Sequence, residues 1–108
     1  MKKKFAYLLL GPQFDPAAHI ARFETAHSVS CIYTVRNYEE ARARAKICTE
    51  EGFGVIELCG AFGPERAKEL IELTDGKVAV GYVTHFAEQD GLFTAFFQNQ
   101  SRQDRSKA

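Results

Sequence analysis

Short apolar runs, separated by polar and helix-forming stretches, set the pattern of this chain. Four runs, 5–10, 28–35, 53–59 and 78–84, are apolar or β-branched almost throughout and are bounded by turn residues. The first is apolar on both faces, as a central strand of a parallel sheet is when helices cover each side. The alternation predicts an α/β fold in which a mostly parallel four-stranded sheet packs against three helices.

Capping residues predict where the first of these helices begins. Asp15 stands directly before Pro16, so it can act as the N-cap with proline at the first helical position, where a missing N–H costs nothing. We expect a short helix from Pro16 to about Ala26. This helix would bury Ile20 and Phe23.

Two further helices follow from the same kind of signal. Asn37 begins the second, because Glu40 three positions later completes a capping-box-like pattern, and this helix is expected to end near Glu51. Pro64 opens the third helix. Numbered along the chain, the four strands are expected in the spatial order 2-1-3-4, a flavodoxin-like sheet truncated at one edge.

The last part of the chain combines large apolar side chains with a polar end. We expect residues 1–97 to form one domain and residues 98–108, which lack large apolar residues, to be a disordered polar tail. The run 92–97 predicts either a fifth strand, antiparallel at a sheet edge, or a segment that docks on a neighbouring subunit. We expect a homo-oligomer, because little secondary structure remains to cover Phe86, Leu92, Phe93, Phe96 and Phe97.

Length and charge narrow the function classes. A chain of 108 residues makes one domain of modest size. Its 14 Lys and Arg are balanced by 14 Asp and Glu, so neither nucleic acid nor a membrane surface is expected as a partner. The apolar run 5–10 ends at Gly11-Pro12 and is too short for a signal-peptide core or a membrane-spanning helix.

The cysteines and histidines argue against disulfides and metals. Cys31, Cys48 and Cys59 are odd in number and lack the C-x-x-C spacing of zinc sites, which fits a reducing cytosol and predicts a cytoplasmic protein. His19 and His27 lack the i, i+4 spacing that places two ring nitrogens on one metal. We predict neither a metal site nor a cofactor.

Polar residues and glycines gather where the predicted strands end. In open α/β sheets the ligand site lies at the carboxyl edge, where helix N-termini point their free N–H groups. We therefore expect a small anionic metabolite to bind at this edge, beside the tight strand-to-helix turn made by the two glycines. The candidate ligand-binding residues are Arg36, Glu57, Cys59, Gly60, Gly63 and His85.

Three of these residues are also candidates for catalysis, and each has a structural alternative. Glu57 interrupts an apolar strand, so it acts as a general acid or base or else makes a structural ion pair. Cys59 is a reactive thiolate or a small core residue. His85 is a base or a surface hydrogen-bonding group. Three function classes follow: a binding module, which we rank first, an enzyme that uses these three residues, and a structural subunit without a ligand.

The most distinctive motif is Ile-Glu-Leu-Cys-Gly-Ala-Phe-Gly-Pro-Glu at residues 56–65. Here the chain resembles a family of small prokaryotic α/β proteins of unknown function, in which a strand ending Ile-Glu-Leu-Cys-Gly leads through Phe-Gly-Pro into a helix. The resemblance extends from the first to about the fourth strand and implies a fold without an activity. The stretch is also similar in style to one βα unit of a phosphate-binding barrel enzyme, so a half-barrel-like sheet is the alternative architecture.

Overall fold

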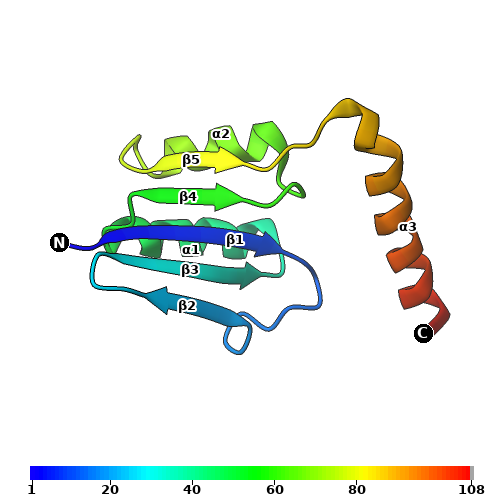
Figure 1. Cartoon of the computed structure of the whole chain (residues 1–108), viewed down its shortest axis with the longest axis horizontal. Helices are drawn as coiled ribbons and strands as arrows, with labels where there is room; N and C mark the ends of the chain where they lie inside the picture. The colour runs from blue at the N-terminus through cyan, green and yellow to red at the C-terminus, as the bar shows by residue number, and fades with distance from the viewer. Residues whose placement is uncertain (108) are drawn as a thin grey trace.

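The computed structural model describes residues 1–107, with side chains described as far as residue 98. It is a small α/β protein whose sheet lies beside two helices, with a third helix beyond one end of the strands (Figure 1). In chain order the elements are β1 (Lys3–Leu10), β2 (Ile20–Glu24), β3 (Ser28–Val35), α1 (Tyr38–Glu50), β4 (Val55–Leu58), α2 (Gly63–Leu73), β5 (Ala79–Tyr82), the 3₁₀ turn η1 (Ala87–Gln89) and α3 (Asp90–Lys107).

The sheet has five strands in the order β2-β3-β1-β4-β5. Strands β3, β1, β4 and β5 are parallel, and they are the four strands predicted from the apolar runs, in the predicted order. The fifth strand, β2, pairs antiparallel with β3 at the edge. The sheet is therefore mixed, and its antiparallel edge strand comes from Ile20–Glu24 and not from the run 92–97.

The expected helix from Pro16 to about Ala26 is wrong, because strand β2 (Ile20–Glu24) occupies the middle of this stretch. The Asp15 carboxylate does accept a hydrogen bond from the Ala17 N–H at 3.0 Å, but only one turn forms. The following residues, Ile-Ala-Arg-Phe-Glu, pair with β3 instead. Ile20 and Phe23, expected to be buried, are exposed. Pairing with a neighbouring strand outweighs the local capping signal here.

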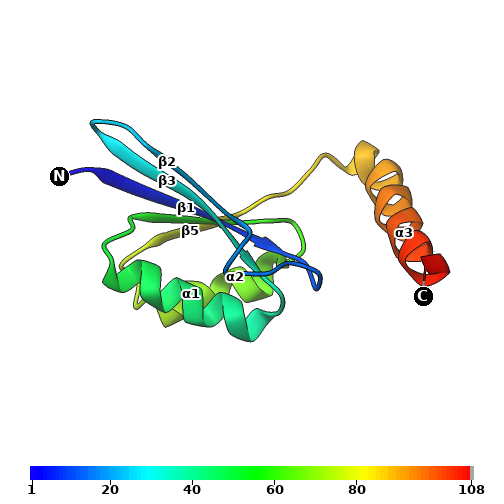
Figure 2. The same ribbon diagram turned by 90° about the horizontal axis from the view of Figure 1, so that it is seen from below.

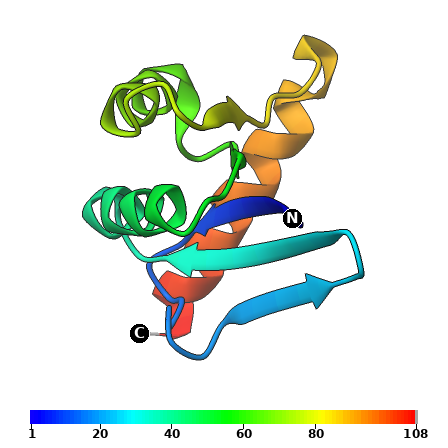
Figure 3. The same cartoon turned by 90° about the vertical axis from the view of Figure 1, so that its left-hand side faces the viewer.

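Helices α1 and α2 both cover the same face of the sheet (Figure 2). Figure 3 shows the same layering along the strands, with the two helices on one side. Helix α1 begins as predicted at Asn37, whose side chain accepts the Glu40 N–H at 2.9 Å, and it buries Ala41, Ala45 and Cys48 against the sheet. The expectation of helices on both faces is wrong, although β1 is apolar on both sides.

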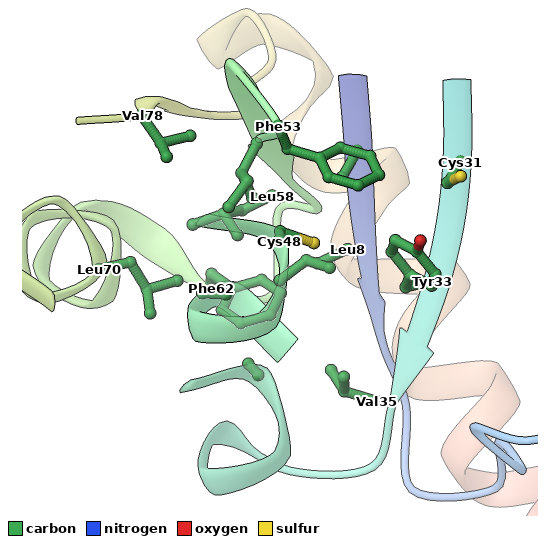
Figure 4. Close-up of a cluster of buried hydrophobic side chains, with 14 of the residues drawn as sticks. Leu8, Cys31, Tyr33, Val35, Cys48, Phe53, Leu58, Phe62, Leu70 and Val78 are labelled. Atoms are coloured by element: carbon green, nitrogen blue, oxygen red, sulfur yellow. The ribbon is translucent and has the colours of Figure 1, made fainter. Parts of the chain in front are cut away.

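The hydrophobic core lies between this face and the two helices (Figure 4). Leu8, Cys31 and Leu58 point into it from three neighbouring strands, and Leu70 packs against them from α2. No helix in the described part of the chain is long and apolar enough to cross a membrane.

Helix α3 stands beyond the ends of the strands and lies on neither face of the sheet (Figure 1). It includes the run 92–97, so the prediction of a fifth strand there is wrong. Leu92 and Phe96, like Phe93 and Phe97, are four residues apart, which fits a helix better than a strand. The helix continues to Lys107, through most of the stretch expected as a polar tail.

Candidate functional site

An open groove of about 1060 Å³ lies at the carboxyl edge of β4 and β5. One wall is the loop between β4 and α2, the floor follows the end of β5, and the opposite wall is α3. The residues that line it are Gly60, Ala61, Gly63, Pro64, Tyr82, Val83, Thr84, His85, Asp90, Phe93, Thr94, Phe97 and Gln98. Of the candidates named from the sequence, the groove brings together Gly60, Gly63 and His85.

The two glycines in the groove have different reasons to be glycine. Gly63 has φ of +73°, a left-handed conformation in which a side chain is strained. A Cβ at Gly60 would meet the Val83 carbonyl oxygen at 3.6 Å, an ordinary contact. The turn from β4 into α2 therefore requires glycine at Gly63, whereas the backbone at Gly60 accommodates a small side chain.

The first turn of α2 presents backbone donors that no described side chain caps. The N-cap position is Phe62, whose side chain is buried in the core and whose N–H is bonded to the Cys59 carbonyl at 3.1 Å. Pro64 has no N–H. The N–H groups of Gly63, which lines the groove, and of Glu65, just beyond its lining, then have no side-chain cap and need partners from outside the helix. Since the positive end of the helix dipole lies here too, this wall of the groove favours a negative group.

His85 connects the end of β5 to α3 through two contacts. Its Nε2 atom lies 2.6 Å from Asp90 Oδ1, and its ring stacks on Phe93 with centroids 3.9 Å apart and planes at 10°. We call His85, Asp90 and Phe93 the elbow. The elbow fixes the first turns of α3 against the carboxyl edge and so forms the second wall of the groove.

Arg36 does not line the groove, and its charge is already paired. Its guanidinium holds the Glu40 carboxylate through two nitrogens, the shorter contact being 2.6 Å, and its backbone N–H donates to the same carboxylate at 2.7 Å. The Arg36 side chain lowers the pKa of Glu40. In this structure the predicted cation for an anionic ligand instead braces the start of α1.

Glu57 lies on the other face of the sheet, away from α1 and α2. It is in register with Tyr7 on β1 and Gly81 on β5. Its carboxylate lies over Gly81, where an added Cβ would be 3.0 Å from Oε2. Burial, followed by the charges of Cys59 and Glu57, raises the pKa of Tyr7. Glu57 and Tyr7 therefore share one polar area that does not line the groove.

The cysteines are buried, and none lines the groove. The Cys59 sulfur accepts the Leu10 N–H at 3.3 Å, so it ties the end of β4 to the end of β1. Burial raises the pKa of Cys48 from 9.0 to about 11. Of the candidates Glu57, Cys59, Gly60 and His85, the groove holds only the last two.

Asp90 and Phe93 are among the groove residues that sequence reasoning missed. Both come from α3, and the run that contains Phe93 was interpreted as a strand or a docking segment. The four-residue spacing of the apolar side chains in 92–97 was the signal that could have placed them on a helix. Among the described residues, no group of three His, Cys, Asp or Glu side chains could hold a metal ion.

Comparison with known families gives one match. Residues 3–98 match a family described as "Family of unknown function (DUF6506)". The chain belongs to this family. A search of curated proteins and a search of solved structures found no match. Membership agrees with the expected family of unknown function, while the prokaryotic origin and the motif at residues 56–65 stay predictions.

Proposed function

We propose that the protein is a binding module for a small anionic metabolite, held in the groove at the carboxyl edge of β4 and β5. The observation that carries this proposal is the uncapped start of α2, which opens onto a groove large enough for a ligand. A volume of about 1060 Å³ lies just above the roughly 300–1,000 Å³ of small-molecule sites, as expected of a groove that is open to solvent.

The two walls of the groove favour different parts of a ligand. The donors of Gly63 and Glu65 suit an anionic group such as a phosphate or carboxylate. The opposite wall offers the aromatic ring of Phe93, stacked on His85, and the floor offers Tyr82. These rings suit a flat or apolar body. The ligand class is therefore a small molecule with an anionic group at one end and an apolar or aromatic part at the other.

Binding is favoured over catalysis because the three candidate catalytic residues lie in different parts of the structure. An enzyme that used Glu57, Cys59 and His85 would need them around one substrate. Glu57 faces the side of the sheet away from the helices, and Cys59 is buried with its sulfur engaged by Leu10. Only His85 lines the groove, and it is engaged by Asp90. The enzyme alternative has less support for this reason.

The start of α1 provides an internal control for a binding experiment. We expect inorganic phosphate, titrated into the labelled protein, to shift the backbone amide signals of Gly63 and Glu65 in NMR spectra. The Glu40 amide at the start of α1 should not move, because Asn37 already accepts its N–H. Equal shifts at both helix starts, or none at α2, would contradict the proposal.

A matched pair of variants sharpens the same experiment. Ala61 is exposed and lines the groove beside Gly63. Ala61→Asp places a carboxylate where the anionic group is expected and should weaken phosphate binding by about tenfold or more, on the order of the energy of one close charge pair. Ala61→Asn has nearly the same shape without the charge and should bind within about threefold of wild type. Equal weakening by both variants would show that charge does not govern the site.

A further inference from the structure

The face of the sheet away from α1 and α2 carries large apolar side chains on three adjacent strands, and neither helix covers it (Figure 2). At one end the loop before β2 reaches this face, where the Thr34 hydroxyl donates to the His19 carbonyl and Thr34 is only 6% exposed. Side chains of residues in register share a face, so Phe5 and Leu9 of β1 lie on the same side as Ile32 of β3 and Phe23 of β2. Phe5 is 37%, Ile32 38% and Phe23 65% exposed. We call Phe5, Phe23 and Ile32 the open patch; Leu9 is partly buried and packs against the core.

A second apolar surface lies on α3. Leu92 and Phe96 are four residues apart, so they form one stripe along the helix, and they are 69% and 62% exposed. Neither residue lines the groove, whose wall on this helix includes Phe93. We call Leu92 and Phe96 the outer stripe. Helix α3 therefore has one side toward the groove and another that exposes Leu92 and Phe96, although the Phe96 ring also contacts the Phe97 ring with centroids 5.1 Å apart.

The elbow keeps the outer stripe away from the open patch of the same chain. The contacts of His85 with Asp90 and Phe93 fix α3 beyond the carboxyl edge, and the helix does not lie over the strands (Figure 2). A single chain thus carries two large apolar surfaces that it cannot bring together while the elbow is formed. Exposed apolar surfaces of this kind mark interaction sites.

We propose that the outer stripe of α3 docks on the open patch of a second copy of this chain, and that the exchange is reciprocal. One chain supplies both halves of the contact, so a two-fold axis places each α3 on the other sheet and closes the assembly as a dimer. In such a dimer β1 is buried on both faces, as its apolar side chains on both sides predict.

The dimensions of the two surfaces agree. Helix α3 has 18 residues and is about 27 Å long at 1.5 Å per residue. The open patch crosses three strands, which span about 10 Å at roughly 4.8 Å between neighbours. Leu92 and Phe96 lie about 6 Å apart along the helix axis, so with their side chains they reach two neighbouring strands of the patch. Glu57, on β4, stays at the border of the contact, where its carboxylate keeps water.

This inference is independent of the proposed ligand site, because the groove side of α3 is not used. It is tested first by the mass of the protein in solution, measured by light scattering at micromolar concentration. We expect a dimer. Ile32→Ser in the open patch and Leu92→Ser with Phe96→Ser in the outer stripe should each raise the dissociation constant about a hundredfold or more. Burying one large aliphatic side chain is worth about tenfold, and a reciprocal contact counts it twice.

Ile47→Ser is the matched control. Ile47 lies on α1 and is 40% exposed, close to the exposure of Ile32, but it belongs to neither surface. This variant should remain a dimer. A monomeric wild type would overturn the proposal. So would loss of the dimer in only one of the two test variants, because that result indicates helix against helix or sheet against sheet.

Crosslinking between chains decides whether the helix docks on its own sheet or on a partner's. A chain with Ile32→Cys is mixed with a chain with Phe96→Cys and oxidised; the native thiols are buried. We expect a disulfide between the two different chains and little between identical ones. A chain that carries both substitutions and closes an internal disulfide at high dilution would overturn the proposal in favour of folding back.

Discussion

The two faces of the sheet are made by the same strands and differ in what covers them. On the face under α1 and α2, Leu8 and Ile56 are fully buried. On the opposite face, Phe5 on β1 and Ile32 on β3 are more than a third exposed. That face carries large apolar side chains together with the polar Ser30 and Glu57. The difference teaches that both faces of the sheet have hydrophobic side chains to cover. The chain covers one face with its own α1 and α2 and leaves the other open.

The largest expected effect is on the free energy of unfolding, which substitutions on the two faces should change differently. Leu8→Ala should lower the free energy of unfolding by about 2–5 kcal/mol, because it leaves a cavity in the packed core. The loss should be the same at any protein concentration. Phe5→Ala should cost little at high dilution and more as concentration rises, since its cover comes from a second chain. Urea unfolding at two concentrations checks both.

If Phe5→Ala were as costly as Leu8→Ala at every concentration, the open patch would be covered within one chain. If it cost nothing even at high concentration, the patch would have no cover at all. Either result would break the comparison between the faces.

Sequence reasoning succeeded where local and tertiary signals agree. Strand β3 and the start of α1 follow from a β-branched run and from Asn37, and the order of the four parallel strands was also predicted. The prediction of a helix at residues 16–26 failed. Asp15 and Pro16 favour a helix turn locally, but pairing of residues 20–24 with β3 decides the structure. That pairing depends on residues distant along the chain, so the local pattern does not contain it.

The candidate site was predicted in part for a similar reason. The carboxyl edge was the correct place to look for Gly60, Gly63 and His85, because topology brings strand ends together. Which side of a strand Glu57 faces, and whether Arg36 meets Glu40 or a ligand, depends on side-chain geometry that spacing does not determine. The contribution of Phe93 depended on recognising α3 as a helix.

A smaller effect is expected from two glycines. Gly63→Ala should destabilise by about 1–2 kcal/mol, because its positive φ is costly for any residue with a Cβ. Gly81→Ala should cost under about 0.5 kcal/mol, since the added carbon meets only the end of the Glu57 side chain, which can turn toward open solvent. Thermal unfolding of both variants measures the difference. A large cost at Gly81 would mean that Glu57 is held in place.

An effect confined to alkaline pH is expected from Cys48, which α1 packs against the covered face. Burial raises the pKa of Cys48 from 9.0 to about 11, so the unfolded chain ionises this thiol first as pH rises. Stability from the neutral thiol is complete below pH 9 and is lost between about 9 and about 11. Cys48→Ala should reduce this alkaline slope. An identical slope in both proteins would show that the thiol does not contribute.

The most direct test of whether a second chain covers the open patch uses a fluorescent reporter at Phe96. The chain has no Trp, so Phe96→Trp gives one signal from the outer stripe. Its emission should move to shorter wavelength as protein concentration rises through the dissociation constant, and Ile32→Ser in the same chain should abolish that shift. Emission that is unchanged by concentration, or a shift that survives Ile32→Ser, would contradict the docking of α3 on the open patch of a second copy.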